Sequence, residues 1–254
     1  MRTNGNLRLL IGAATTMLAC LFLAGCAQTT APEPNIIQRA NGEKPAPPPS
    51  SGFLGADYSL MQPPAEGSDQ EAMLRYINPS GNWSSYNKIM IAPVTFWASD
   101  DSKVSAADQQ ALCNYFYTVL EKQLGTNFTL VDQPAPGVMK FSAAFTGASS
   151  AVPVLRTVSL VVPQARALSI IKMAATGTYA FVGSAQGEAK LNDSVSGELL
   201  AAWADKRVGG ASLKNVDVFT WGDANNAMNY WADGLGKRLV TLGVQQSGTA
   251  ASNP

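Results

Sequence analysis

The spacing of hydrophobic residues divides the chain into predicted strands and helices. Short apolar runs at 88–94, 128–132 and 138–146 predict three strands. Between the first two runs, apolar residues recur at helical spacing over 105–125, where a Ser-x-x-Asp start resembles a capping box and a glycine ends the run. The pattern therefore begins with the order β-α-β-β.

Alternation is clearest at 178–191, where small or apolar residues alternate with polar ones such as Glu188 and Lys190. Such alternation predicts a strand with one face on the core and the other in water. Turn residues at 192–197 and a second run at 198–207 complete a predicted hairpin.

Three further segments complete the pattern. Residues 152–162 predict an edge strand or an ordered loop, and 164–174 a short helix. In the last helix we expect Asp223 to be the N-cap, and Gly234 and Gly236 to mark close backbone packing. Its apolar stripe is Ala224, Met228, Trp231, Leu235 and Leu239. The order predicts an α+β or mixed α/β fold, a single sandwich-like domain with a mainly antiparallel sheet and two principal helices.

The amino-terminal residues predict a signal peptide at 1–25. Arg2 and Arg8 precede the uncharged run 9–23, which is the charge pattern of a secretory signal. The run ends in Leu23, Ala24, Gly25 and Cys26, and this ending resembles the bacterial lipobox. The resemblance implies cleavage before Cys26 and attachment of diacylglycerol to its sulfur.

The alternative for this segment is an uncleaved anchor, because 9–27 is about long enough to span a bilayer. Thr15 and Thr16 dilute that run, so we favour cleavage. Residue Ala27 after the cysteine, by resemblance to enterobacterial sorting signals, implies the outer membrane with the protein facing the periplasm.

Composition separates a tether from a folded body. Residues 26–52 are rich in proline and polar residues, so they predict an extended spacer that does not pack, with a proline-rich ligand for a partner as the alternative. We expect the body at 53–243 and a frayed, disordered tail at 244–254. Charged residues are 14% of the chain, against roughly 25% in an average globular protein, and 46% are hydrophobic, so the body can bury a core.

The composition also excludes several classes of function. The chain has no histidine, which excludes Ser-His-Asp and Cys-His catalysis and histidine metal sites. Its formal net charge is zero, so no basic surface for nucleic acid is indicated. No glycine-rich phosphate loop, CxxC pair or calcium loop occurs, and we expect no cofactor.

Several short motifs follow one another between residues 53 and 207. They are Phe53-Leu54 with Asp57-Tyr58-Ser59-Leu60, Arg75-Tyr76 with Pro79, Tyr86-Asn87-Lys88-Ile89, Pro93-Val94 with Trp97, and Val195-Ser196-Gly197-Glu198 closing on Asp205-Lys206-Arg207. In this order they resemble an uncharacterised family of bacterial lipoproteins, the domain of unknown function 3313, over about residues 50–240. The resemblance implies a lipidated envelope protein with an α/β body. It carries no catalytic residues over to this chain.

Two sets of residues are candidates for catalysis. Ser169 and Lys172 match the S-x-x-K of serine acyl-enzymes, but the partner motifs S-D-N and K-T-G are absent. Carboxylate pairs for glycoside hydrolysis lie about 5–9 Å apart. The candidate acids are Asp100, Asp101, Glu188 and Asp205. We expect solvated turns for the first two. For Glu188 and Lys190, on the polar face of their strand, we expect surface ion pairs with oppositely charged residues of the partner strand, where Asp205, Lys206 and Arg207 lie.

Aromatic residues are the candidates for binding. Trp83, Tyr86, Trp97 and Trp221 lie in or beside predicted loops, where exposure would create a contact patch for a glycan or protein. Trp203 belongs to the same set of possible sugar-stacking residues, and Trp231 we expect in the core. Cys113, on a helix beside an apolar stripe, we expect to be buried and inert, with an intermolecular disulfide as the alternative.

The sequence therefore predicts a non-catalytic, lipid-anchored envelope protein that binds a protein or glycan partner. A small cell-wall hydrolase and a carrier of an apolar ligand are the alternatives. A pocket with converging acids would favour the hydrolase, and an empty apolar cavity the carrier. An exposed aromatic patch or a bare sheet edge would favour the binding protein.

Overall fold

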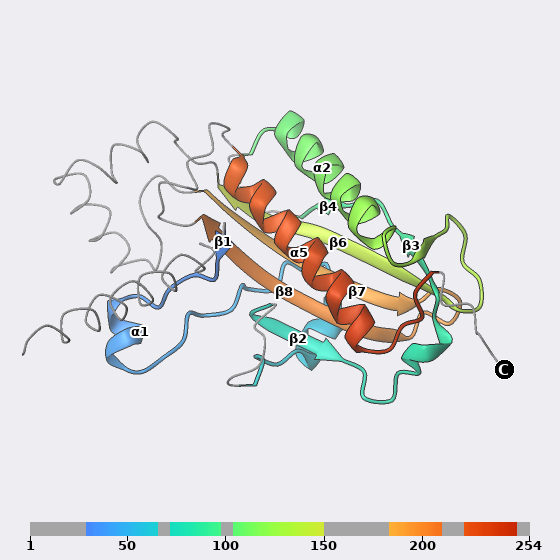
Figure 1. The fold of residues 1–254 in the computed structure, drawn as a ribbon. Coiled ribbons are helices and arrows are strands. Elements are labelled where there is room, and N and C mark those ends of the chain that lie inside the picture. Colours follow the sequence, from blue (N-terminus) through green and yellow to red (C-terminus); the bar gives the residue numbers. More distant parts are fainter. Residues whose placement is uncertain (1–28, 66–71, 98–103, 150–182, 210–220, 248–254) are drawn as a thin grey trace, which may run out of the picture.

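Three long antiparallel strands form the centre of the sheet (Figure 1). They are β6 (Val138–Ser149), β7 (Ser184–Asp193) and β8 (Leu199–Gly209). The computed structural model describes residues 29–65, 72–97, 104–149, 183–209 and 221–247. The predicted signal peptide with Cys26, the segments 152–162 and 164–174, and the candidates Ser169, Lys172, Asp100 and Asp101 lie outside these residues.

Shorter strands extend the sheet on both sides in the order β1-β8-β7-β6-β3-β5. Strand β3 (Lys88–Ile91) is parallel to both β6 and β5 (Thr129–Leu130), and β4 (Thr95–Phe96) is parallel to β6. On the other side β1 (Thr29–Thr30) and β2 (Leu74–Ile77) pair antiparallel with β8. The sheet is thus mixed and mainly antiparallel, and the predicted α+β class is confirmed.

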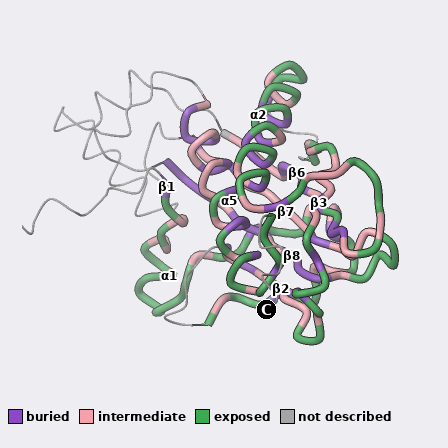
Figure 2. The backbone as a smooth tube through the Cα atoms, turned by 45° about the vertical axis from the view of Figure 1, so that its right-hand side comes forward, coloured by how far each residue is buried: buried purple, intermediate pink, exposed green. Residues whose placement is uncertain are grey.

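Two long helices cover one face of the sheet (Figure 1). Helix α2 (Ala106–Leu124) begins after Ser105, whose side chain accepts the backbone N–H of Asp108 as the sequence predicts. Helix α5 (Gly222–Thr241) packs beside it. Both helices turn their buried residues toward the strands, and the main hydrophobic core lies between these layers (Figure 2).

The opposite face of the sheet is also covered, so the predicted wet face is wrong. The 3₁₀ helix η1 (Gly55–Leu60) and strand β2 lie over it with the residues around them. A second, smaller core forms there from Leu54, Met61, Leu74, Ala202 and Ala204. A second 3₁₀ helix, η2 (Trp83–Ser85), precedes β3. Glu188, expected in water, is only 2% exposed.

The segment predicted as an unpacked tether contains ordered structure. Thr29 and Thr30 pair with Gly209 and Val208 of β8, and α1 (Ile36–Ala40) follows as a short capped helix. The Tyr58 hydroxyl also donates a hydrogen bond to the carbonyl of Pro48. The expectation of an unpacked tether is therefore wrong for the described residues 29–52, which contain a paired strand, a capped helix and a hydrogen bond to η1.

Helix α5 and the following residues differ from the sequence prediction at several points. Trp221 occupies the N-cap position, and Asp223 is a buried residue of the first turn. No atom outside the helix backbone lies within 4 Å of a methyl group placed on Gly234 or Gly236, so the predicted close packing is wrong. The predicted tail is ordered at its start, since the N–H of Gln245 donates to the Tyr86 carbonyl at 3.0 Å.

Candidate functional site

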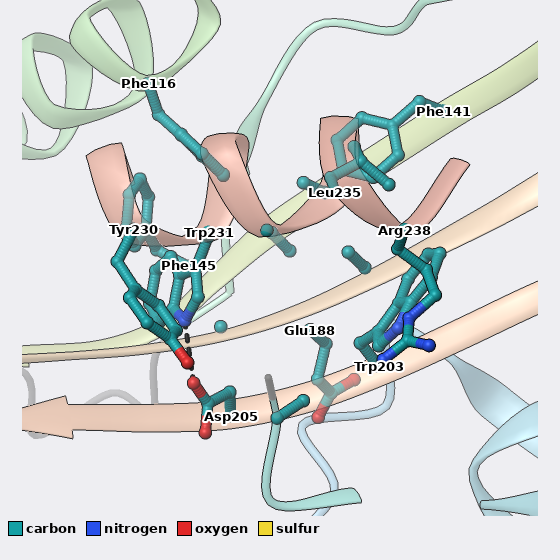
Figure 3. Close-up of a pocket in the computed structure, with 16 residues that line it drawn as sticks. Phe116, Phe141, Phe145, Glu188, Trp203, Asp205, Tyr230, Trp231, Leu235 and Arg238 are labelled. Atoms are coloured by element: carbon teal, nitrogen blue, oxygen red, sulfur yellow. Dashed lines mark hydrogen bonds between the residues drawn. The ribbon is translucent and has the colours of Figure 1, made fainter. Parts of the chain in front are cut away.

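A pocket lies between helix α5 and the strands β6, β7 and β8 (Figure 3). It contains about 70 Å³ in which the centre of a water molecule fits, and a single water needs about 10–15 Å³ on this measure. Its walls are mainly apolar, and the large side chains are Phe116, Phe141, Phe145, Trp203, Trp231 and Leu235. The volume suits a small apolar group.

Small residues beneath α5 create the space. Ala143 of β6 is paired with Ala189 of β7, and Gly187 follows at the next position on the same face. Gly234 contributes no side chain from the helix above, where a methyl group would meet nothing within 4 Å. The pocket is therefore a region where small residues of the sheet and the helix face each other.

Aromatic rings close one end of the pocket. The ring centroids of Phe116 and Phe145 are 5.7 Å apart, and Trp231 lies 6.0 Å from the first and 6.3 Å from the second. These are distances at which aromatic pairs attract one another. Trp231 thus belongs to the edge of the core, as its place on the apolar stripe predicts, and it also forms a pocket wall.

Asp205 orients that wall. Its Oδ2 accepts hydrogen bonds from Trp231 Nε1 and Arg207 Nε, both at 2.8 Å, and its Oδ1 accepts the Met73 N–H at 3.1 Å (Figure 3). Burial raises the pKa of Asp205, and the Arg207 guanidinium opposes that rise. The carboxylate joins α5, β8 and the residue before β2, which fixes the indole.

Arg207 is used twice. Besides its ion pair with Asp205, its guanidinium carbon lies 3.9 Å from the centroid of the Tyr230 ring, and Tyr230 lines the pocket. A guanidinium over an aromatic face is a favourable cation–π arrangement. The polar side of the pocket is consequently held in one arrangement.

Glu188 borders the pocket, but its carboxylate serves the other face of the sheet. Oε1 accepts the Ser51 N–H at 2.7 Å and Oε2 the Leu54 N–H at 3.3 Å. Figure 3 shows its side chain pointing away from α5. Residues that alternate along a strand project to opposite faces, and Asp205 is paired with Gly187. The structure therefore does not bring the Glu188 and Asp205 carboxylates together as a catalytic pair.

The predicted surface ion pair of Glu188 is also wrong. Its partners are the two backbone amides, whereas Asp205 is bound to Arg207 within β8. The lysine on the same strand face, Lys190, approaches Asp57 of η1 at 3.5 Å. The charged residues of the hairpin hold neighbouring segments of the chain.

The aromatic residues that were candidates for a contact patch are not gathered on the surface. Trp83 and Tyr86 are buried, and Trp221 donates its Nε1–H to Asp108 at 3.1 Å. Trp97 is 47% exposed and packs edge-on against Phe53 with centroids 5.7 Å apart. These four residues therefore do not form a shared surface patch, and other aromatic residues line the pocket instead.

Cys113 is buried in the main core, as expected, and burial raises the pKa of its thiol. A raised pKa keeps a thiol protonated and unreactive at neutral pH. Within the described residues, no three His, Cys, Asp or Glu side chains come close enough to hold a metal ion. Nor does that part of the chain contain a helix with the length and apolarity needed to cross a membrane.

Sequence reasoning missed a buried carboxylate at the start of α5. Asp223 Oδ2 accepts the Gly183 N–H at 2.6 Å, and a methyl group on Gly209 would lie 2.1 Å from Asp223 Oδ1. The contact explains why glycine ends β8. An acidic residue immediately before an apolar helical stripe was the only sequence signal, and that signal is equally typical of an N-cap.

Comparison with known proteins identifies a similar family. The model of the family described as protein of unknown function (DUF3313) matches residues 49–235. No protein with a curated description matches the chain.

Among solved structures, a PelC dodecamer from Paraburkholderia phytofirmans is similar at 7% identity and a TM-score of 0.34, covering 63% of this chain and 95% of that one. The hypothetical protein CT253 from Chlamydia trachomatis is similar at 8% identity and a TM-score of 0.29, covering 61% and 94%. No functional argument follows from similarity at this level.

Proposed function

Since this chain belongs to the DUF3313 family of proteins of unknown function, we propose its function from its own residues. It is a lipid-anchored protein of the bacterial cell envelope, attached to the outer membrane through acylated Cys26 and facing the periplasm. It acts by binding another envelope component and not by catalysis.

The anchor rests on the sequence that precedes the described residues. Leu23-Ala24-Gly25-Cys26 follows a charged start and an apolar run, as in a lipoprotein signal. Two or more acyl chains on Cys26 give lasting membrane attachment, at about 0.8 kcal/mol per buried CH₂. No other segment is needed to hold the protein at its membrane.

The pocket beneath α5 is the observation that carries the binding role. It is concave and walled by aromatic and aliphatic side chains, which are features of sites for apolar groups. The acids near it are used to fix side chains and loops, since Asp205 accepts three hydrogen bonds and Glu188 accepts two on the opposite face. The bound group would be an aliphatic or aromatic part of a protein partner.

The same pocket supports a second candidate, carriage of a small apolar ligand. The two functions differ in what occupies the pocket in the cell. Organic extraction of the purified lipoprotein followed by mass spectrometry separates them. A stoichiometric small molecule favours carriage, and an empty pocket with a stable protein complex favours the binding role.

The direct test is crosslinking of the native lipoprotein in envelopes, followed by its purification. Gly234→Leu adds a whole leucine side chain at a pocket-lining position with open space around it, and Val240→Leu, an apolar substitution at an exposed position of the same helix, is the control. We expect the wild type and Val240→Leu to recover the same partner and Gly234→Leu to lose it. Muropeptide turnover by the wild-type protein without any recovered partner would contradict the proposal.

A further inference from the structure

The end of the sheet that carries β1 lies close to the proposed anchor. Thr29 is paired with Gly209, and only two residues separate Thr29 from Cys26. Three residue steps span at most about 11 Å even when fully extended. The structure therefore allows no long spacer between the acylated cysteine and the sheet, contrary to the sequence expectation.

Helix α1 presents two large apolar side chains at the same end of the molecule. Ile36 is 63% exposed and Ile37 is 69% exposed, and no residue of α1 is buried. Figure 1 shows α1 at the same end of the molecule as β1 and clear of the two helices that cover the sheet. Reciprocal hydrogen bonds between Asn35 and Gln38 cap the start of the helix, so the exposed pair belongs to a formed helix.

From this juxtaposition we infer that α1 rests on the bilayer that holds Cys26, with Ile36 and Ile37 inserted among the lipids. This inference rests on the proposed acylation. Short amphipathic helices bind at the surface of a bilayer. Their apolar side chains enter the acyl-chain region, and their polar side chains remain among the lipid headgroups. Gln38 and Arg39 supply those polar side chains on the following positions.

A second copy of this chain is a poorer occupant of the same surface. A stable protein interface needs about 800 Å² from each partner, or 20–30 residues, and α1 offers five residues with one exposed pair. The bilayer has no such requirement, because the acyl chains already supply the attachment. The isoleucines then set the orientation of the body: the β1 end faces the membrane, and the β7–β8 turn points away from it.

The test places a fluorescent probe at each end of the acylated full-length protein. Ile37→Cys and Val195→Cys are made in a Cys113→Ala background, labelled with an NBD fluorophore and reconstituted into phosphatidylethanolamine–phosphatidylglycerol vesicles. Val195 is the matched control because it is 64% exposed and lies in the β7–β8 turn. That turn and β1 lie at opposite ends of β8, a strand about 35 Å long.

We expect the probe at position 37 to show a blue-shifted emission and quenching by spin-labelled lipid, and the probe at 195 to show neither. Equal, water-like emission at both positions in vesicle-bound protein would overturn the orientation and leave the anchor standing. A blue shift at 37 that appears without vesicles and grows with protein concentration would identify a second copy as the occupant, against the inference. Failure of the unlabelled protein to float with vesicles would overturn the anchor and the inference together.

Discussion

The two faces of the sheet are both buried, but they are held in different ways. The α2 and α5 face has the larger core, and its buried acid Asp205 is balanced by Arg207. The opposite face has a small core, and its buried acid Glu188 accepts hydrogen bonds from the backbone amides of Ser51 and Leu54. Each of these two acids holds a segment from another part of the chain against the sheet.

The difference predicts unequal consequences of losing each carboxylate. Asp205 neutralises the buried charge of Arg207, whereas Glu188 accepts hydrogen bonds from the neutral backbone amides of Ser51 and Leu54. Removing one partner of a buried ion pair costs more than removing an acceptor from neutral amides. Loss of the Asp205 carboxylate should therefore destabilise the whole domain, whereas loss of the Glu188 carboxylate should loosen residues 51–54 locally.

The largest effect is expected for Asp205→Ala. It leaves the Arg207 guanidinium and the Trp231 indole N–H buried without this acceptor, which should lower the free energy of unfolding by about 3–5 kcal/mol. Urea denaturation measures the loss. Asp205→Asn, which keeps the shape and part of the hydrogen bonding, is the control and should cost less. A loss for Asp205→Ala no greater than that for Glu188→Ala would remove the contrast between the faces.

A smaller and more local effect is expected for Glu188→Ala. The freed N–H groups of Ser51 and Leu54 should cost about 1–3 kcal/mol. Hydrogen exchange should accelerate at residues 51–54 while α5 stays protected. Lys190→Ala, on the same strand face, is the matched control. Uniform acceleration across both faces would contradict a separately held cover.

The pH dependence of stability should report the hydrogen bond from the Tyr86 hydroxyl, just before β3, to Asp193 at the end of β7. Burial, and then the hydrogen bond to Asp193, raises the pKa of Tyr86 from 10.0 to about 12. Because the folded-state pKa lies above the unfolded value, this stabilisation is complete below about pH 10 and is lost as pH rises toward about 12. Urea titrations should show a shallower alkaline loss for Tyr86→Phe. An unchanged slope would mean that the contact does not form in solution.

The smallest effect should be a gain. Gly234→Ala adds a methyl group that meets nothing within 4 Å, and alanine is favoured over glycine within a helix by about 0.5–1 kcal/mol. Thermal denaturation should show a modest rise in Tm. The control is Gly209→Ala, where the methyl group would overlap Asp223 and should destabilise. A fall in Tm for Gly234→Ala would show that α5 lies closer to the strands than the pocket implies.

Local patterns in the sequence predict most of the elements and little of the site. The Ser105 cap, the α2 stripe and the β7–β8 hairpin depend on residues close together in the chain, and all three are present. The fate of Glu188 depends on residues 51–54, which are remote in sequence, so alternation within one strand could not reveal that its second face is covered.

The pocket was missed for the same physical reason. Its walls come from α2, β6, β7, β8 and α5, and its volume depends on Ala143, Ala189 and Gly234 facing one another. Ala143 and Ala189 are ordinary residues at their positions, and Gly234 inside a helix was interpreted as a sign of close packing. Only the register of the strands and the placement of α5 over them bring the set together.

Mass spectrometry of the amino-terminal peptide, with fractionation of the envelope, tests the central claim most directly. Wild-type protein and Cys20→Ser, which alters the predicted signal peptide only, should both begin at a diacylglycerol-modified Cys26 and sediment with membranes. Cys26→Ser should lack the lipid and leave the wild-type membrane fraction. A wild-type protein with unmodified Cys26, or a Cys26→Ser protein that fractionates like the wild type, would contradict lipid anchoring.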